Sequence, residues 1–389
     1  MKLRILTIAI AFSLSASGCF GMSELSVDLD NLVSLAETID ELENEESGSA
    51  AQEQEVLPKN VILVIGDGMG VAQVYSSIVL QGGDSSQFLR FPYTGFSRTY
   101  CLNRYTTDSG AGGTALVGGN KVNKSGISLS PSGVIHPSLF AKAAEKGLST
   151  GFVVTSSVLD ATPASTYAHV PERHMFDTIS LQMSQCSHSV MIGGGRTNFR
   201  PENRKDGLSP IDTLTKRGYD VVYTMDSMLR SGSDKLCALL YEDYYPSYVT
   251  ARDGMLTMGV LKALATLGRN PKGFALLVEG SQIDWACHNN DSAYLEGELR
   301  DFEQMLKAVL DFADHDGNTL VVVTADHETG GLTLKSGDIE KRQNNYSFST
   351  GDHTGVMVPV FSYGPGSEYF TGIQQNTDIA NKIIYLLGL

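Results

Sequence analysis

The stretch Asn60–Gly70, NVILVIGDGMG, is a run of branched apolar residues that ends on Asp67 between two glycines. The run does not alternate between polar and apolar residues. Such a run is typical of a strand buried on both faces of a mostly parallel sheet. The stretch therefore predicts an α/β fold that presents an acidic side chain at the carboxyl end of a central strand.

Six further runs of the same kind follow along the chain: STGFVVTSS (149–157), SVMIGG (189–194), YDVVYT (219–224), FALLVEG (274–280), TLVVVTA (319–325) and VPVFSYG (358–364). The spacing of apolar residues predicts helices between them, at 110–118, 136–146, 173–184, 208–217, 251–267, 291–314 and 376–387. Repeated strand–helix units predict a three-layer α/β/α sandwich around a mostly parallel sheet.

The composition limits the kind of partner. The formal net charge is −15 and the sequence pI is near 4.9. This acidity argues against a nucleic-acid-binding protein, which needs a basic surface. An anionic substrate remains compatible with it, because bound metal ions reverse the charge of a site.

The N-terminus predicts export. Residues 1–18 combine Lys2 and Arg4 with an apolar run and small residues, the pattern of a signal peptide. The sequence ASGC ending at Cys19 resembles a lipobox with Ala16 in place of the usual Leu, so Cys19 is either a lipid anchor or follows ordinary cleavage after Gly18. Residues 19–57 hold eleven acidic residues and no Lys or Arg, which favours a tether over the alternative of a partner-binding helix.

Four other cysteines follow: Cys101, Cys186, Cys237 and Cys287. An exported protein could oxidise them, but the chain has no CxxC spacing and the sequence leaves any pairing open. The plainer interpretation is that most of them are small buried side chains.

Acidic and imidazole side chains cluster at the predicted strand ends. They are Asp67, Glu279, Asp284, His288, Asp326, His327 and, after a short gap, His353. Any one of them could be a turn residue, a helix cap or a structural histidine. Together they would meet at one edge of the sheet, where uncompensated carboxylates repel one another. Groups that include histidine suit Zn²⁺, whereas a group of oxygens alone suits Mg²⁺.

The segment RYTTDSGAGGTALVGG (104–119) places Ser109 before a run of small residues. It could be a surface turn. Alternatively, Ser109 is a nucleophile at a helix N-terminus, where backbone N–H groups attract an anion such as phosphate. A serine needs a base or a metal to be nucleophilic, and an arginine such as Arg173 would hold phosphate oxygens in a bidentate manner.

These motifs together resemble the alkaline phosphatase family. TTDSG, DATPASTYAHVPER, EGSQIDWACH, TADHETGG and HTG occur in the family's order, and the resemblance covers about 60–389, leaving a catalytic domain at 58–389. It implies hydrolysis of a broad range of small phosphate monoesters, with Ser109 forming a phosphoserine and Arg173 binding the phosphoryl group. It also implies a homodimer with two Zn²⁺ and one Mg²⁺.

The resemblance further implies the metal ligands. Asp284, His288 and His353 would hold one zinc, and Asp67, Asp326 and His327 the other, which would activate Ser109. Asp67, Thr162 and Glu279 would hold the magnesium.

Two positions vary within the family: Asp160, expected to act through water near the magnesium, and Trp285, where some members carry Lys or His. Their combination predicts an altered magnesium affinity and pH optimum. Only about 25 residues separate His327 from His353, which predicts a short or absent crown insertion. The sequence indicates no chemistry for residues 187–270.

Two alternatives remain at this stage. A related phosphodiesterase or sulfatase would share the two-metal core, but the segment DSGAG lacks the sulfatase context, and Arg173, Thr162 and Glu279 favour monoesters. A zinc-binding or adhesion protein without catalysis would lack the nucleophile or a ligand, and none is missing.

Overall fold

The computed structural model describes residues 57–252 and 254–389, which lie in one compact unit. The predicted signal peptide (1–18), Cys19 and all of the acidic tether except Leu57 lie outside these residues. In the two described ranges, no helix has the length and apolar character needed to span a membrane.

The described strands of the main sheet are β1 (Asn60–Gly66), β2 (Tyr93–Arg98), β3 (Ser149–Ser157), β4 (Val190–Gly194), β5 (Asp220–Val222), β6 (Leu236–Leu239), β7 (Phe274–Gly280), β8 (Thr319–Thr324), β13 (Val358–Tyr363) and β14 (Gly372–Gln375). Their order is β14-β2-β13-β8-β1-β7-β3-β4-β6-β5. Among them, only β13 runs antiparallel to its neighbours, β2 and β8. The mostly parallel sheet is confirmed.

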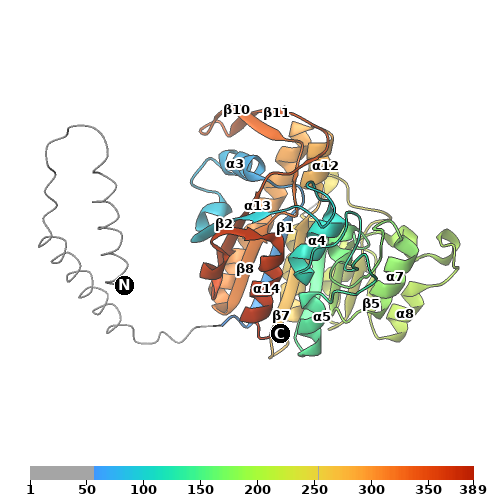
Figure 1. The fold of residues 1–389 in the computed structure, drawn as a ribbon. Helices are drawn as coiled ribbons and strands as arrows, with labels where there is room; N and C mark the ends of the chain where they lie inside the picture. Colours follow the sequence, from blue (N-terminus) through green and yellow to red (C-terminus); the bar gives the residue numbers. More distant parts are fainter. Residues whose placement is uncertain (1–56, 253) are drawn as a thin grey trace, which may run out of the picture. The chain divides into compact units, whose positions relative to one another are not determined.

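Helices cover both faces of the sheet (Figure 1). The longer ones are α3 (Val71–Leu80), α4 (Ser109–Gly118), α5 (Leu139–Glu145), α7 (Phe176–Gln185), α8 (Pro210–Lys216), α11 (Met255–Leu267), α12 (Gln282–His288), α13 (Ser292–Asp316) and α14 (Asn376–Leu386). Along β1, Ile62 and Val64 pack into one core with α3, α11 and α13, and Leu63 packs into the other with α4, α5 and α14. Because both faces of β1 are covered, the strand is apolar from Val61 to Ile65, and the three-layer sandwich is confirmed.

Several expected boundaries need correction. The strand expected at 219–224 is only the three residues of β5, while β2, β6, β14 and the helices α3 and α12 were not expected. The helix expected at 173–184 begins at Phe176. Arg173 lies in the preceding turn, where its backbone N–H donates to Ser125 O at 2.9 Å and its side chain contacts Asp108.

The helix expected at 251–267 is also wrong as a single element. It is divided into α10 (Tyr248–Ala251) and α11, with Gly254 in the left-handed region at φ +68°. Between them, the buried Arg252 Nη1 lies 2.5 Å from Glu298 Oε2 and 2.7 Å from Asp301 Oδ2 on α13. These ion pairs join the segment between α10 and α11 to α13, a contact that the spacing of apolar residues does not predict.

The substitution Arg252→Met is expected to lower the free energy of unfolding by about 3–5 kcal/mol near neutral pH, because two buried carboxylates lose their cation. Denaturant unfolding at constant m value measures the loss. The triple variant Arg252→Met/Glu298→Gln/Asp301→Asn removes all three charges and should recover most of the stability. If Arg252→Met were as stable as the triple variant, the prediction would be contradicted.

The span between His327 and His353 contains a two-stranded hairpin, β10 (Leu332–Asp338) and β11 (Gln343–Phe348), which Figure 1 shows beside α3. Tyr346 Oη lies 2.8 Å from Ser76 Oγ on α3, and Asn344 Nδ2 donates to Ser76 O at 3.2 Å. This hairpin stands where a crown would be inserted, so the expectation of a short or absent crown is confirmed.

The cysteines of the described residues are free thiols. Cys101, Cys237 and Cys287 are buried and Cys186 is half-buried. The interpretation that most of them are small buried side chains is confirmed within the described ranges.

Candidate active site

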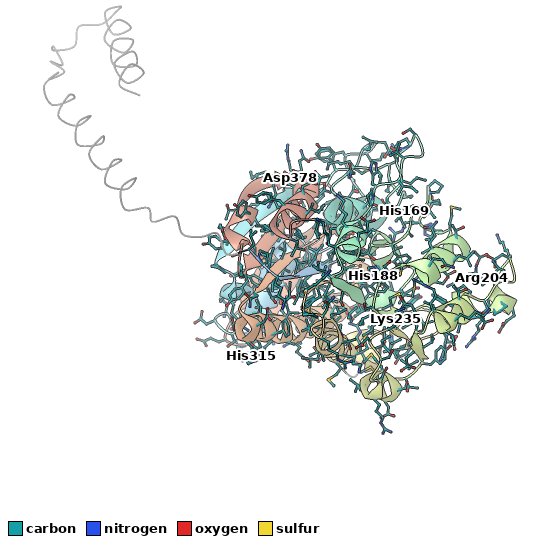
Figure 2. The ribbon with its side chains drawn as sticks, turned by 90° about the horizontal axis from the view of Figure 1, so that it is seen from below. His169, His188, Arg204, Lys235, His315 and Asp378 are labelled. Carbon is teal, nitrogen blue, oxygen red and sulfur yellow. The ribbon has the colours of Figure 1, made fainter. Side chains whose placement is uncertain are left out.

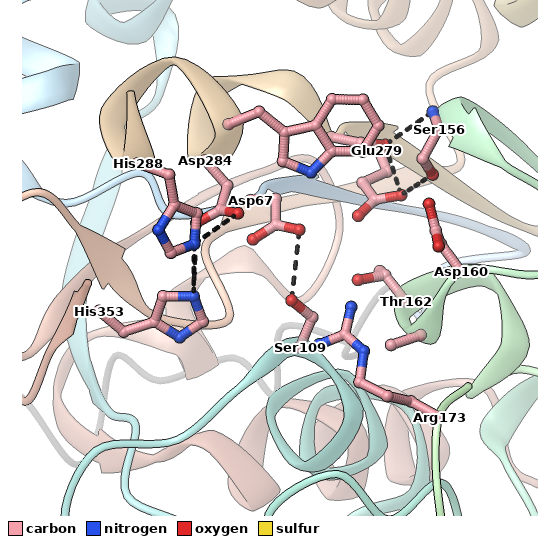
Figure 3. A pocket seen from close by; sticks show the side chains of 13 residues that line it. Asp67, Ser109, Ser156, Asp160, Thr162, Arg173, Glu279, Asp284, His288 and His353 are labelled. Atoms are coloured by element: carbon pink, nitrogen blue, oxygen red, sulfur yellow. Dashed lines mark hydrogen bonds and ion pairs between the residues drawn. The ribbon is translucent and has the colours of Figure 1, made fainter. Parts of the chain in front are cut away.

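The candidate site lies at the carboxyl ends of the central strands. β1 pairs Gly66 with Gly280 of β7, so Asp67 lies beside the segment that leads into α12. A cavity of about 240 Å³ opens at this edge of the sheet. It is lined by Asp67, Ser109, Ser156, Asp160, Ala161, Thr162, Arg173, Glu279, Ser281, Asp284, Trp285, His288 and His353 (Figure 3).

Ser109 is the first residue of α4, as the small-residue motif predicts. Its Oγ donates to Asp67 Oδ2 at 3.4 Å and lies 3.3 Å from His327 Nε2. Ser109 is 3% exposed, so its hydroxyl reaches solvent only through the cavity. The helix places its N-terminal backbone N–H groups at the same end, which favours an anion there.

The glycines that follow Ser109 permit close packing of the helix. A Cβ on Gly112 would lie 3.0 Å from Asp326 Cβ, and one on Gly113 would lie 3.2 Å from Ser165 Oγ and 3.4 Å from Thr162 Cα. The chain segments that carry Asp326 and Thr162 therefore pack directly against the backbone of α4.

Asp108 is a functional residue that the sequence reasoning missed. It is the N-cap of α4: its Oδ1 accepts hydrogen bonds from Ala111 N at 3.3 Å and Ser125 N at 3.0 Å. Its Oδ2 lies 3.2 Å from Arg173 Nη1. One carboxylate thus starts the helix of Ser109 and orients the arginine beside it. The signal was an N-cap residue type directly before Ser109.

Asp67, Asp326 and His327 form one candidate metal group, with ligand atoms within 4.8 Å of one another. Asp326 Oδ1 accepts from the N–H groups of Gly68 and His327, but Asp326 Oδ2 and Asp67 Oδ1 are buried without a hydrogen bond. These two oxygens lie 3.1 and 3.5 Å from His327 Nε2. Buried acceptors that converge without a donor suit a cation.

Asp284, His327 and His353 form a second such group, and His288 adjoins it. His288 Nδ1 lies 2.6 Å from Gly351 O, and His353 Nδ1 lies 2.9 Å from Thr107 O, so each Nδ1 serves as the donor to a carbonyl. In the neutral form of each ring, Nε2 is then an acceptor, and the two Nε2 atoms lie 3.1 Å apart beside Asp284 (Figure 3). Facing lone pairs of this kind fit zinc, whose histidine ligands are oriented by such carbonyl partners.

The side chains of a third group offer only oxygen atoms as ligands. Ser281 Oγ donates to Glu279 Oε2 at 2.7 Å, and Asp160 Oδ2 accepts from Ser157 N at 3.3 Å. Figure 3 shows Asp160 and Thr162 on the same side of the cavity as Glu279. Oxygen ligands in this combination suit magnesium.

The electrostatics agree with cation binding. Burial, reinforced by the charges of Asp326, Asp284 and Glu279, raises the pKa of Asp67 well above its usual value. Burial also raises the pKa of Glu279 to about 8. Burial lowers the pKa of His353 to about 4, while hydrogen bonding to Asp284 raises that of His288 to about 9. Two carboxyls that resist ionisation mark a region that needs positive charge.

Tertiary structure brings His353 to the site. It lies on β12 (His353–Thr354), which pairs antiparallel with β9 (Glu328–Thr329), so His353 lies opposite Thr329. The rings of His327 and His353 stack with centroids 3.6 Å apart. The structure therefore brings the predicted site residues together; Asp326 and His327 contact this group through Ser109 and Asp67 but are not among the residues that line the cavity.

The other described histidines do not line the cavity. His188 is buried between Thr166 and Thr150, with its ring nitrogens 2.8 and 2.9 Å from their hydroxyls, and burial lowers its pKa to about 3. Figure 2 shows His169 and His315 in other parts of the molecule. These residues illustrate the structural role that a single histidine usually has.

Comparisons with known proteins identify the family of this chain. A family model described as alkaline phosphatase matches residues 58–341. Alkaline phosphatase 4 of Bacillus subtilis (strain 168) is 32% identical over 431 residues, which cover 89% of this chain and 92% of that protein.

A solved structure is also similar. The alkaline phosphatase of the Antarctic bacterium TAB5 is 35% identical with a TM-score of 0.80, over 85% of this chain and 99% of that one. A variant of that enzyme in which a histidine is replaced by aspartate has Mg bound in its M3 site.

Proposed function

Since this chain belongs to the alkaline phosphatase family of metal-dependent phosphomonoesterases, we propose that it hydrolyses phosphate monoesters through a phosphoserine on Ser109. The observation that carries the proposal is the position of Ser109. Its Oγ lies at the N-terminus of α4, between Asp67 and His327, in the cavity that Arg173 also lines.

Two displacements at phosphorus would give the reaction. In the first, Ser109 Oγ loses its proton and bonds to phosphorus while the ester P–O bond breaks and its electron pair leaves with the alcohol oxygen, which is protonated. In the second, a water oxygen displaces Ser109 Oγ, which regains a proton as inorganic phosphate forms. Two inversions give net retention of configuration. Arg173, held by Asp108, binds the phosphoryl oxygens throughout.

Three ligand sets drawn from the groups described above would hold the metals, with His288 in place of His327 beside Asp284 and His353 and with Asp67 joining the oxygen group. Asp284, His288 and His353 would bind one zinc, Asp67, Asp326 and His327 the other, and Asp67, Thr162 and Glu279 the magnesium. Bound there, the ions would supply Lewis-acid stabilisation of the attacking and leaving oxygens. The two buried carboxylate oxygens without donors, Asp67 Oδ1 and Asp326 Oδ2, support this assignment.

Export and assembly are further parts of the proposal. Residues 1–18 would direct the chain out of the cytoplasm, with Cys19 as a lipid anchor or Gly18 as the cleavage point, leading to a periplasmic, membrane-anchored or secreted enzyme. A homodimer is the expected assembly, since closed twofold symmetry is the commonest arrangement.

The test compares p-nitrophenyl phosphate with bis(p-nitrophenyl) phosphate at alkaline pH, with zinc and magnesium present. Faster hydrolysis of the monoester would support the proposal. Preference for the diester would overturn the roles of Arg173 and the magnesium group. Turnover of neither substrate would favour the non-catalytic binding protein.

The substitution Asp160→His is expected to raise the magnesium concentration needed for half-maximal activity about 10- to 100-fold. Asp160 lines the cavity beside Thr162, and imidazole is a poorer partner for a hydrated magnesium ion than a carboxylate is. A magnesium titration of activity measures the shift, and the zinc requirement serves as the control. An unchanged magnesium dependence would remove Asp160 from this role.

A further inference from the structure

Trp285 and Tyr244 form an aromatic pair beside the cavity, and the reaction steps proposed above use neither side chain. Trp285 lines the cavity, and its ring lies 4.8 Å from that of Tyr244 at an interplanar angle of 70°. Tyr244 is 57% exposed, so much of its ring is open to solvent. It belongs to the segment YEDYY (241–245), in the region where the sequence indicated no chemistry.

The segment 241–245 is anchored at both ends. Arg196 N donates to Tyr241 O at 3.1 Å, and the Glu242 carboxylate pairs with Arg196 at 2.5 Å and with Arg200 at 2.8 Å. Tyr245 is buried, and Gln282 Nε2 on α12 donates to Tyr245 O at 2.8 Å. A ring held on such a segment loses little conformational freedom when it binds a ligand.

Close packing also places the segment on the sheet. A Cβ on Gly194, the last residue of β4, would lie 2.4 Å from Asp243 O and 2.9 Å from Tyr244 Cα. The backbone of residues 243–244 therefore rests directly against the carboxyl end of β4. The exposed ring of Tyr244 is therefore attached to a backbone that is fixed against the sheet.

The pair lies where the organic part of an ester would emerge. In the proposed reaction the phosphoryl group would lie at Ser109 and Arg173, and the leaving oxygen would face Asp284 and His288 (Figure 3). Trp285 belongs to the same helix, α12, as these two residues. A group attached to that oxygen would pass beside Trp285 toward Tyr244. Aromatic rings prefer to stack with an offset or edge to face on other rings.

We propose that Tyr244 and Trp285 bind the leaving group and make the enzyme selective for aryl phosphate monoesters over alkyl ones. The inference rests on the proposed function of the cavity. Aryl esters are also intrinsically more reactive, so rates alone would not separate recognition from leaving-group chemistry. The test therefore uses phosphonates, whose P–C bond the enzyme does not hydrolyse.

The chain contains one tryptophan, so its intrinsic tryptophan fluorescence reports directly on the cavity. The measurement is the ratio of the Kd of methylphosphonate to that of phenylphosphonate, by fluorescence titration of the zinc- and magnesium-loaded protein. In Tyr244→Ala and in Tyr244→Leu the ratio is expected to fall about 3- to 10-fold, and in Tyr244→Phe to stay near that of the parent.

A matched control is available on α14. Tyr385 is 61% exposed, but its ring pairs with that of Tyr369 at 6.1 Å and not with that of Trp285, so Tyr385→Ala should leave the ratio unchanged. An unchanged ratio in both Tyr244→Ala and Tyr244→Leu would overturn the inference. Because the phosphonate titration needs no turnover, that outcome is distinct from a failure of the proposed function, which would show as no hydrolysis of any monoester.

Discussion

The substitution Ser109→Ala is expected to lower kcat for p-nitrophenyl phosphate by about 10⁴- to 10⁶-fold, the scale on which removal of a serine nucleophile acts. The hydroxyl is the group in the cavity that both faces Asp67 and His327 and stands at the N-terminus of α4. Without it, water would have to attack the ester in a single step. Arg173 and its partner Asp108 remain, so binding of inorganic phosphate should persist.

Acid quenching of the reaction with a ³²P-labelled monoester provides the second readout. The parent enzyme should retain label on the peptide that contains Ser109, and Ser109→Ala should retain none. Ser130→Ala, which changes a half-buried serine outside the cavity lining, is the control and should behave like the parent. Label that persists in Ser109→Ala would assign the covalent step to another residue.

Removal of the metals is expected to abolish activity and to lower the Tm. Asp67, Glu279, Asp284 and Asp326 are buried together, and a cation is what offsets their repulsion. Ions bound at about 1,000 times their Kd stabilise the folded state by about 4 kcal/mol per site. Dialysis against a chelator, followed by differential scanning calorimetry and an activity assay, measures both effects.

The decrease in Tm on metal removal should depend on pH. Burial raises the pKa of Glu279 from 4.5 to about 8, and that of Asp67 is also raised. A carboxyl whose pKa is higher in the folded protein than in the unfolded chain makes its full contribution to stability at pH values below the unfolded-state pKa. That contribution is lost as the pH rises through the folded-state pKa. The Tm difference between metal-loaded and metal-free protein should therefore widen as pH rises from about 5 to about 8.

Adding zinc and magnesium back to the chelated protein is the control, and it should restore both activity and Tm. A Tm difference that narrows with rising pH would contradict the assigned ligands. Full activity in metal-free protein would contradict the metal requirement itself.

The sequence specified the layers of the fold through local patterns. β3 and β7 have the predicted boundaries, because a strand covered on both faces carries a continuous apolar run at its centre, here FVV in β3 and FALLV in β7. β2 and β11 were not predicted, because their exposed positions interrupt such an apolar run. The helix boundaries near Arg173 and Arg252 also escaped, because each arginine is held by a carboxylate far away in the chain.

By itself, the sequence determined the α/β sandwich, the residue types of the candidate site and their order along the chain. Those properties depend on apolar periodicity and on short motifs, which are local. Only the tertiary structure decided that His353 returns to His327 through β9 and β12, that Asp108 holds Arg173, and that Tyr244 stands beside Trp285. These contacts join residues from about 40 to 65 positions apart or pair strands across an intervening hairpin, and such pairings depend on how the elements pack, which no local pattern encodes.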